Sequence, residues 1–554
     1  MERRDKIISR NDIEAQIAEG RKIVIVDDRV LKVDAWLPYH PGGDKAILHM
    51  VGRDATNEVR AFHSAETQAL MLKFQIGRIQ GQWIDFLPTI QGGVFRKRQT
   101  EEDGYQASGK NDCSADESSG EENSVEPSPI FEAQKRQEAL RTHGDSDADS
   151  ISSTTSLGSS ILQLPATPGK IPVASAHELE NFPSLDPVTQ GHIVTKYHEL
   201  DQRVRAAGLY NCDYSAYLAE ITRYAILGSL SYYFLQEQWF ILSAILLGML
   251  WHQLVFTVHD AGHMGITHDF QIDSCIGIFI ADFLGGLSCC WWKRNHNVHH
   301  IVTNSAEHDP DIQHLPFFAI SSQFFDGLRS SYYDHVMAYD PFAKFMIRYQ
   351  QYLYYPVLAL GRFNLYRLSW QYILLGQGPR KGPARWHRYL EMIGQVFFWY
   401  WFGYLVLYKS IPTAGWRIIY LLVSHVVTMP VHAQITLSHF AMSTTDLGVA
   451  ESFPQRMLRT TMDVDCPPWL DFFHGGLQFQ AMHHLFPRIP RHNLRKCQGM
   501  VQEFCHDVGI PYEIYGFQHG NEKVIGHLAD IAKQAKMLAE CQNSLTVSDA
   551  IRGH

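Results

Sequence analysis

The chain has 554 residues, a length that fits two to four domains, and 29 of them are histidines. Its formal net charge of −10 is concentrated in one segment, because residues 101–160 alone contain 14 acidic and 4 basic side chains. The rest of the chain is balanced in charge, so we expect no nucleic-acid partner. Nine cysteines without a CxxC pair speak against a disulfide framework or a cysteine-based zinc site and fit a reducing compartment.

Residues 1–95 have the pattern of a small soluble domain. The run from Ile23 to Leu37 alternates in polarity and is rich in β-branched residues, which predicts strands, and helical segments follow it. The first 30 residues contain no long apolar stretch. We therefore expect no signal peptide and an N-terminus that stays in the cytosol.

Two histidines in this region stand in distinctive local sequences. His40 opens the motif His-Pro-Gly-Gly, and His63 lies in Ala-Phe-His-Ser. Haem ligation by two histidines needs imidazoles that face each other across an apolar slot. Glycines let the backbone turn closely beside the porphyrin edge. The alternative is a surface turn plus an unrelated histidine, and we interpret His49 as a surface histidine.

Residues 7–82 resemble the cytochrome b5 family. Besides the two histidine motifs, the resemblance rests on Trp36-Leu37-Pro38 and on the segment 52–56, which reads Gly-Arg-Asp-Ala-Thr. The resemblance implies a small α+β haem-binding domain, with His40 and His63 as the axial ligands of haem b.

Residues 96–185 form a segment rich in Ser, Asp, Glu and Pro and poor in aromatic residues. Such a composition cannot bury enough apolar surface to offset the loss of conformational entropy, which predicts a disordered acidic linker. We interpret it as a solvated tether, with phosphorylation of its serines as the alternative.

Long apolar blocks begin after residue 186 and predict about four transmembrane helices. Ile276–Leu287 and the region 349–360 are too short or too polar and are expected to be re-entrant or interfacial. Basic residues that flank the later blocks place the polar stretches 259–390 and 439–554 on the cytosolic side. The four predicted spans are Tyr224–Leu235, Trp239–Val258, Met392–Tyr408 and Ile418–Leu437, the last broken by Pro430.

Three histidine clusters follow one spacing rule. On a helix, residues i, i+3 and i+4 share one face, so each cluster directs two or three ligands toward one volume. Many imidazoles with few carboxylates suit iron in a nitrogen-rich site. A zincin-type site is the alternative for a single cluster, but Asp260 stands where that motif needs glutamate. The clusters are His259 and His263; His296, His299 and His300; and Gln480, His483 and His484.

These clusters resemble the histidine boxes of the membrane fatty-acid desaturase superfamily, over roughly residues 200–515. The glutamine that opens the third box and the N-terminal haem domain resemble its front-end branch. The resemblance implies two non-haem iron ions, with His439 as a further ligand and Gln480 either as a weak ligand or as a hydrogen-bonding group. Asp260, Asn297, Asp309 and Asp311 are candidates for orienting the imidazoles. The implied iron ligands are His259, His263, His296, His299, His300, His483 and His484.

The resemblance implies an oxygen-dependent lipid desaturase of the endoplasmic reticulum membrane, with O2 as co-substrate. Its haem domain and histidine boxes would face the cytosol. Electrons would enter through the haem from an NADH-cytochrome b5 reductase, because the chain lacks a Gly-rich dinucleotide fingerprint. The expected architecture is multidomain, with an α+β haem domain and an all-α membrane domain under a cytosolic di-iron cap. The expected divisions are 1–95, 96–185, 186–515 and a helical tail at 516–554.

The stretches 291–316 and 471–488 are similar to those of Δ8 sphingolipid desaturases, and the long acidic linker resembles fungal members. The implied substrate is a sphingoid long-chain base, within a ceramide, desaturated at its 8-position. Alternatives are a front-end acyl-lipid or acyl-CoA desaturase and a haem-fused lipid hydroxylase. A non-catalytic haem-binding membrane adaptor is a further alternative, which the three intact boxes disfavour.

Overall fold

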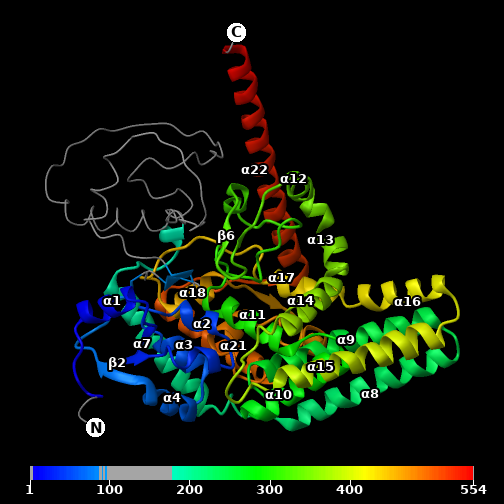
Figure 1. Cartoon of the computed structure of the whole chain (residues 1–554), viewed down its shortest axis with the longest axis horizontal. Coiled ribbons are helices and arrows are strands. Elements are labelled where there is room, and N and C mark those ends of the chain that lie inside the picture. The colour runs from blue at the N-terminus through cyan, green and yellow to red at the C-terminus, as the bar shows by residue number, and fades with distance from the viewer. Residues whose placement is uncertain (1–3, 87–89, 92–93, 96–177, 553–554) are drawn as a thin grey trace, which may run out of the picture.

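A computed structural model describes residues 4–86, 90–91, 94–95 and 178–552 (Figure 1). The predicted disordered linker, apart from its last residues from 178 onward, lies outside the described residues. The N-terminal domain lies on one side of the molecule, and a bundle of long helices extends from the other.

The N-terminal domain is α+β. The four residues of β1 (Ile23–Val26) are all buried and pair antiparallel with β2 (Arg29–Lys32), which pairs in turn with β3 (Gln75–Arg78). Its core includes Ile13, Val30 and Val51. The β-branched run thus forms strands where the sequence predicts them. The helices are α1 (Arg10–Ala18), α2 (Asp44–Leu48), α3 (Thr56–Phe62) and α4 (Ala65–Met71), with short turns η1 (Leu37–Tyr39) and η2 (Leu72–Phe74) and a hairpin of β4 (Ile90–Gln91) and β5 (Val94–Phe95).

Within the described residues, three helical stretches are long and apolar enough to cross a membrane. They cover Phe240–Gly262, His387–Ser410 and Ala414–Leu437, with mean hydropathies of 1.9, 1.2 and 1.5. A bent pair, Phe270–Leu284 with Cys289–Ile301 at an angle of 118°, brings the number of candidates to four if the pair counts as one span. The corresponding elements are α9 (Phe240–Gly262), α10 (Phe270–Ile278) with η3 (Phe279–Leu284), α11 (Cys289–Ile301), α15 (His387–Phe398) with η5 (Trp399–Ser410), α16 (Ala414–Val426) and α17 (Met429–Leu437).

The predicted span over 224–235 is not among these candidates. These residues belong to α8 (Tyr214–Gln236), which packs against α9 as a hairpin, with Ser231 Oγ donating to the Ser243 carbonyl at 2.9 Å. Glu220, Arg223 and several tyrosines and serines make α8 less apolar than its partner. The segment 276–287, predicted to be re-entrant or interfacial, belongs to the bent pair, whose geometry is that of a broken span or a re-entrant loop. As predicted, Pro430 marks the break between α16 and α17.

The remaining elements form the globular part that carries the third histidine box. The first half of α22 (Phe517–Arg552) is packed, since Val524 and Leu528 are buried, and its end projects from the molecule (Figure 1). The other elements are α7 (Pro187–Ala206), η4 (Ser322–Asp326), β6 (Arg329–Ser330), β7 (His335–Val336), α12 (Pro341–Arg348), α13 (Gln350–Ala359), α14 (Gly361–Leu375), α18 (Phe453–Arg459), β8 (Asp463–Asp465), η6 (Pro468–Leu470), α19 (Asp471–His474), α20 (Gln480–Leu485), α21 (Arg491–Val508) and β9 (Ile514–Gly516).

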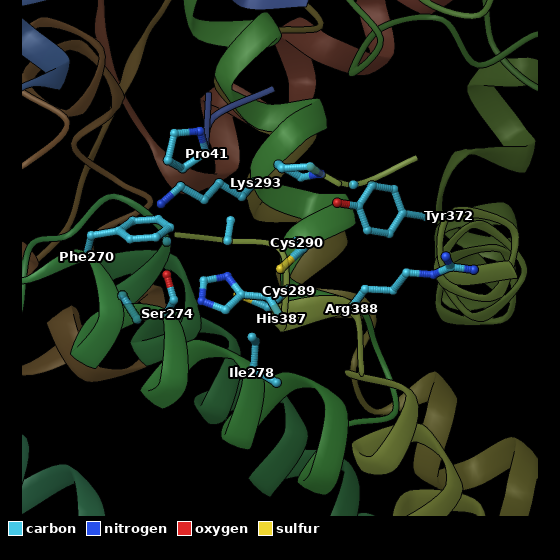
Figure 2. A pocket seen from close by; sticks show the side chains of 15 residues that line it. Pro41, Phe270, Ser274, Ile278, Cys289, Cys290, Lys293, Tyr372, His387 and Arg388 are labelled. Carbon is cyan, nitrogen blue, oxygen red and sulfur yellow. The ribbon is translucent and has the colours of Figure 1, made fainter. Parts of the chain in front are cut away.

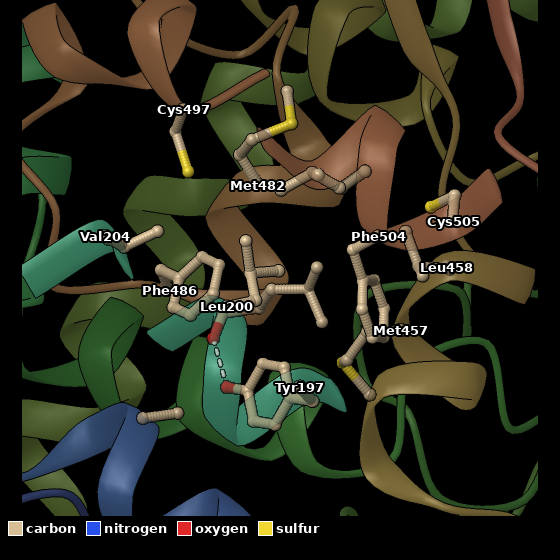
Figure 3. Close-up of a cluster of buried hydrophobic side chains, with 14 of the residues drawn as sticks. Tyr197, Leu200, Val204, Met457, Leu458, Met482, Phe486, Cys497, Phe504 and Cys505 are labelled. Carbon is tan, nitrogen blue, oxygen red and sulfur yellow. Dashed lines mark hydrogen bonds between the residues drawn. The ribbon is translucent and has the colours of Figure 1, made fainter. Parts of the chain in front are cut away.

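A buried apolar cluster formed by α7, α18, α20 and α21 packs against the helix of the third box (Figure 3). The ring of Tyr197 stacks on Phe486 with centroids 5.6 Å apart, and its hydroxyl donates to the Leu485 carbonyl at 2.8 Å. Leu485 and Phe486 directly follow the two histidines of α20. The cluster therefore fixes the end of the helix that presents those histidines.

Replacing Phe486 with alanine is expected to lower the free energy of unfolding by about 3–5 kcal/mol, because a fully buried ring is lost and a cavity remains. Thermal unfolding of the detergent-purified protein measures the change. Phe345, which is 58% exposed, provides the matched control, since its replacement by alanine removes little buried contact. Equal stability of the two variants would contradict the proposed support of α20.

Candidate metal centre and haem site

The end of α9, the C-terminal half of α11 and helix α20 meet with their histidines turned toward one another. His259 and His483 have ring centroids 4.4 Å apart. His263 and His300 are 4.9 Å apart, and His300 stacks on His484 at 4.1 Å. Segments more than 200 residues apart thus bring all three predicted boxes into one buried volume.

Within this volume, two groups of imidazoles are each close enough to share a metal ion. In each group the potential ligand nitrogens all lie within 4.8 Å of one another. His300 is fully buried and contacts rings of both groups. His439 comes from the turn after α17, and the second group shows that it lies beside the boxes. The groups are His259, His263, His296 and His483, and His299, His439 and His484.

Several of these nitrogens are buried without a hydrogen-bond partner among the described residues. A buried polar atom left unpaired costs about 1–3 kcal/mol, so a set of five would be a heavy penalty without a ligand. Imidazole nitrogens are suitable ligands for iron. The donor set fits metal coordination by its position and its chemistry. The unpartnered atoms are His259 Nε2, His263 Nε2, His300 Nδ1, His483 Nε2 and His484 Nε2.

Burial favours the neutral form of His439, His483 and His484, which is the form that metal ligation requires. Loss of solvation lowers the pKa of His483 and of His484 well below the ordinary value, and neighbouring histidines add to the effect. The pKa of His439 falls to about 3 for the same reasons. Neutral imidazoles offer a lone pair at physiological pH and do not repel a cation.

Two carboxylates of the loop after α11 contact histidines of the second box. His299 Nδ1 lies 2.8 Å from an oxygen of the fully buried Asp309, and His296 Nδ1 lies 3.4 Å from Asp311. The Asp309 carboxylate is itself held by the backbone N–H groups of Asn304 and Asp311. Such partners fix the tautomer and leave the opposite nitrogen, Nε2, as the one that could bind a metal.

Replacing Asp309 with asparagine is expected to weaken iron binding about 10- to 100-fold, because the amide no longer holds the His299 tautomer. Iron retained after dialysis against a chelator measures the effect. The matched control is Asp465→Asn on the exposed end of β8. Iron retention equal to that of the unmodified chain would show that Asp309 does not orient His299.

Two of the four residues expected to orient the imidazoles, Asp260 and Asn297, contact other groups instead. Asp260 is paired with Arg491 and Tyr217, and its carboxylate is not bonded to an imidazole. Arg491 also binds Glu220 and the Phe256 carbonyl, so it ties the first box to α8 and α21. Asn297 donates to the Gly42 carbonyl at 3.1 Å, which places it against the N-terminal domain.

Sequence reasoning missed Asp463, which organises the third box. Its buried carboxylate accepts from the Ala481 N–H at 2.9 Å, at the start of α20, and from the Tyr512 hydroxyl. Burial raises its pKa to about 7. Gln480 donates from its amide to the Leu477 carbonyl at 3.2 Å. A capping carboxylate 18 residues upstream leaves no local signal in the sequence.

In the N-terminal domain, the rings of His40 and His63 face each other with centroids 6.1 Å apart. His40 Nδ1 lies 2.6 Å from the Gly43 carbonyl oxygen, and His63 Nδ1 lies 3.1 Å from that of Val59. These contacts leave Nε2 of each ring free to bind a metal. Burial lowers the pKa of both imidazoles, that of His63 to about 3. The pair fits a haem held between two neutral histidines.

The glycines of the His-Pro-Gly-Gly motif are required by close contacts. A Cβ on Gly42 would lie 2.7 Å from Asn297 Nδ2 and 2.9 Å from the ring of His40. Gly43 adopts φ of +90° and abuts Arg294. His49, interpreted from sequence as a surface residue, is instead buried with its ring 5.1 Å from that of His308. That interpretation was wrong because docking of the two domains covers the position.

A cavity with an empty volume of about 500 Å³ lies beside the first two boxes (Figure 2). Gly262, between the two histidines of the first box, forms part of its wall, and Pro41 of the N-terminal domain forms another part. Figure 2 shows the Tyr372 hydroxyl and the Lys293 side chain at this space. The cavity is thus lined by the N-terminal domain together with α10, α11, α14 and α15.

Comparison with known protein families shows which family this chain belongs to. The family model described as Fatty acid desaturase matches residues 237–516, and the one described as Cytochrome b5-like Heme/Steroid binding domain matches residues 9–80. The chain belongs to the fatty acid desaturase family and carries a cytochrome b5-like domain at its N-terminal end. It is therefore an oxidoreductase with a built-in domain for electron transfer.

Curated relatives narrow the similarity further. A Delta 8-(E)-sphingolipid desaturase of Emericella nidulans is 58% identical over 100% of this chain and 99% of its own length. Proteins of the same name from Kluyveromyces lactis and Candida albicans are 50% and 47% identical, each over 98% of this chain and over 95% and 98% of their own lengths. The resemblance to fungal members inferred from the sequence is confirmed.

Proposed function

We propose that this protein is a Δ8-(E)-sphingolipid desaturase. It introduces a trans double bond at the 8-position of a sphingoid base within a ceramide, using O2 and electrons relayed through its own cytochrome b5 domain. The observation that carries the proposal is the 47–58% identity, over nearly the whole chain, to fungal proteins of that name. Both the haem-binding domain and the histidine boxes fall within the matched length.

We assign two iron ions to the buried histidines. When bound, they supply the oxygen chemistry that breaks unactivated C–H bonds, which no side-chain acid or base can do. The chain contributes neutral imidazoles, the carboxylates that orient them, and a buried volume that excludes water. Gln480 is the weakest candidate ligand, since its amide is turned to a backbone carbonyl. The assigned ligands are His259, His263, His296, His299, His300, His439, His483 and His484.

We assign haem b to the N-terminal domain, with His40 and His63 as axial ligands. Each double bond requires two electrons from outside the substrate, and we propose an NADH-cytochrome b5 reductase as their source. Fusion to the desaturase domain keeps the donor at a high effective concentration. The corresponding divisions are a haem domain at 1–95, a linker at 96–185, a desaturase domain at 186–515 and a C-terminal tail at 516–554.

We place the protein in the endoplasmic reticulum membrane, with the haem domain and the boxes on the cytosolic side. The support is the charge at the helix ends, because basic residues concentrate in cytosolic flanks. Four basic residues stand before α15 or in its first turn, whereas Lys409 at the end of η5 and Arg417 in α16 are the basic residues around the short connection at the other end. The four are Arg380, Lys381, Arg385 and Arg388.

A front-end acyl-lipid desaturase is the second candidate. A Delta(8)-fatty-acid desaturase of Helianthus annuus is 40% identical, but over 54% of this chain, and an Acyl-lipid (9-3)-desaturase of Borago officinalis is 37% identical over 56%. The fungal sphingolipid enzymes match more closely and over more of the chain. A lipid hydroxylase with the same histidines is a weaker alternative.

Lipid mass spectrometry tests the proposal. The chain is expressed in a host whose sphingoid bases lack the 8-double bond, and the unsaturated position is located after fragmentation. The expected product is a sphingoid base that has lost two hydrogens between carbons 8 and 9. New double bonds confined to fatty-acyl chains would identify the acyl-lipid enzyme, and gain of one oxygen would identify a hydroxylase.

A further inference from the structure

The N-terminal domain lies directly against α11, the helix of the second histidine box. Arg294 of α11 pairs with Asp44 at 2.9 Å, next to the His-Pro-Gly-Gly motif. Asn297, between two histidines of the box, donates to the Gly42 carbonyl, and Lys45 donates to the Ser331 carbonyl at 2.8 Å. These contacts therefore fix the position of the His-Pro-Gly-Gly motif relative to the histidines of the second box.

An apolar core shared by both domains reinforces these polar contacts. Side chains of β1, β2 and α2 pack with the outer face of α11 and the loop beyond it, so the interface is buried as well as hydrogen-bonded. Burial of this apolar surface stabilises the contact between the two domains. The shared cluster contains Val24, Val26, Leu31 and Met50 of the N-terminal domain with Val298, Ile301, Val302 and Tyr332 of the desaturase domain.

One residue at this interface is next to His63 in the chain and contacts a histidine of the boxes. Phe62, the last residue of α3, is joined through a single peptide bond to His63. Its ring meets the ring of His300 edge to face, with centroids 5.6 Å apart and an interplanar angle of 83°. His300 in turn contacts rings of both imidazole groups. One covalent step and one ring contact thus separate a haem ligand from a central residue of the metal site.

We propose that Phe62 is the contact through which electrons pass from the haem site to the iron site, and that the docked arrangement is the state that transfers them. This inference rests on the proposed function. For each double bond, two electrons pass singly across Phe62. With two protons from solvent and the two hydrogens of the substrate, they reduce one O2 to two waters. After each transfer the haem returns to its oxidised form and is reduced again by the reductase.

Replacement of Phe62 with alanine tests the contact. Haem reduced without oxygen is mixed with O2 and substrate, and its reoxidation is followed by absorbance. The variant is expected to lose most of the reoxidation rate, while its haem spectrum, midpoint potential and reduction by the reductase stay unchanged. Phe62→Tyr, which keeps the ring, is expected to retain the rate. The matched control is Phe86→Ala, which removes a ring packed in the same domain on Trp83 and Gly52.

An unchanged reoxidation rate in Phe62→Ala would overturn the proposal. So would an equal loss of the rate in Phe86→Ala, or its loss in Phe62→Tyr, because neither result depends on losing the ring of Phe62. Absence of the Δ8 product from the unmodified chain would instead count against the proposed function. The two failures are therefore distinguishable.

A charge exchange tests the docked state without using turnover. Arg294→Glu places two acids in contact and is expected to raise hydrogen exchange in α3 and α11. The double variant Arg294→Glu with Asp44→Arg restores opposite charges and is expected to restore protection and reoxidation rate together. Faster exchange of α3 with an unchanged reoxidation rate would show that transfer does not need this arrangement.

Discussion

Replacing His484 with alanine is expected to abolish double-bond formation. His484 is fully buried in α20, within ligand distance of His299 and His439, and stacked on His300. Its loss removes one of the three imidazoles of the smaller group. Lipid analysis measures the product, and metal analysis is expected to show less non-haem iron.

The haem serves as an internal control for this variant, because His40 and His63, its proposed ligands, lie in a separate domain with its own core. The visible haem spectrum of His484→Ala should match that of the unmodified chain. His506→Ala on α21 is the matched control, since its side chain is 91% exposed, and it should keep full activity. Persistent product from His484→Ala would remove this residue from the ligand set.

Replacing His63 with alanine is expected to remove haem absorbance and desaturation together. One of the two facing imidazoles is lost, and the remaining His40 cannot hold the haem from both sides. Absorbance of the purified protein reports haem content, and lipid analysis reports the product. The iron content of the desaturase domain should not change, because His63 does not belong to either imidazole group.

Lys73→Ala provides the control for this second variant, because Lys73 is exposed in the same domain. It should keep both haem and activity. Normal desaturation by His63→Ala, with the haem absent, would show that electrons reach the iron site by a route outside the fused domain. That result would also overturn the role proposed for Phe62.

Local spacing alone makes the histidine boxes recognisable in the sequence. Histidines at i, i+3 and i+4 share a helical face, so His296, His299 and His300 point into one volume once their segment is helical. The β-branched run 23–37 and the break at Pro430 follow equally local rules. Each of these features depends on residues within a few turns of chain.

The membrane spans follow less completely from the sequence, for a reason visible in α8. Its polar residues lie close to α9 and α21, where Arg491 binds Glu220 and Tyr224 binds the Gln253 carbonyl. A window of sequence cannot show that such groups are satisfied by a neighbouring helix. Likewise, the 118° bend between α10–η3 and α11 depends on packing and hydrogen bonding that involve α14 and α15.

The sequence by itself determined the spacing of the histidines and the presence of a cytochrome b5-like and a desaturase part, because helix periodicity and composition are local properties. Only the tertiary structure decided that His439 joins His299 and His484, that Asp309 rather than Asp260 holds an imidazole, and that Phe62 meets His300. These are contacts between segments far apart in the chain. They arise when apolar faces are buried against each other, and no local pattern specifies which partner a face will find.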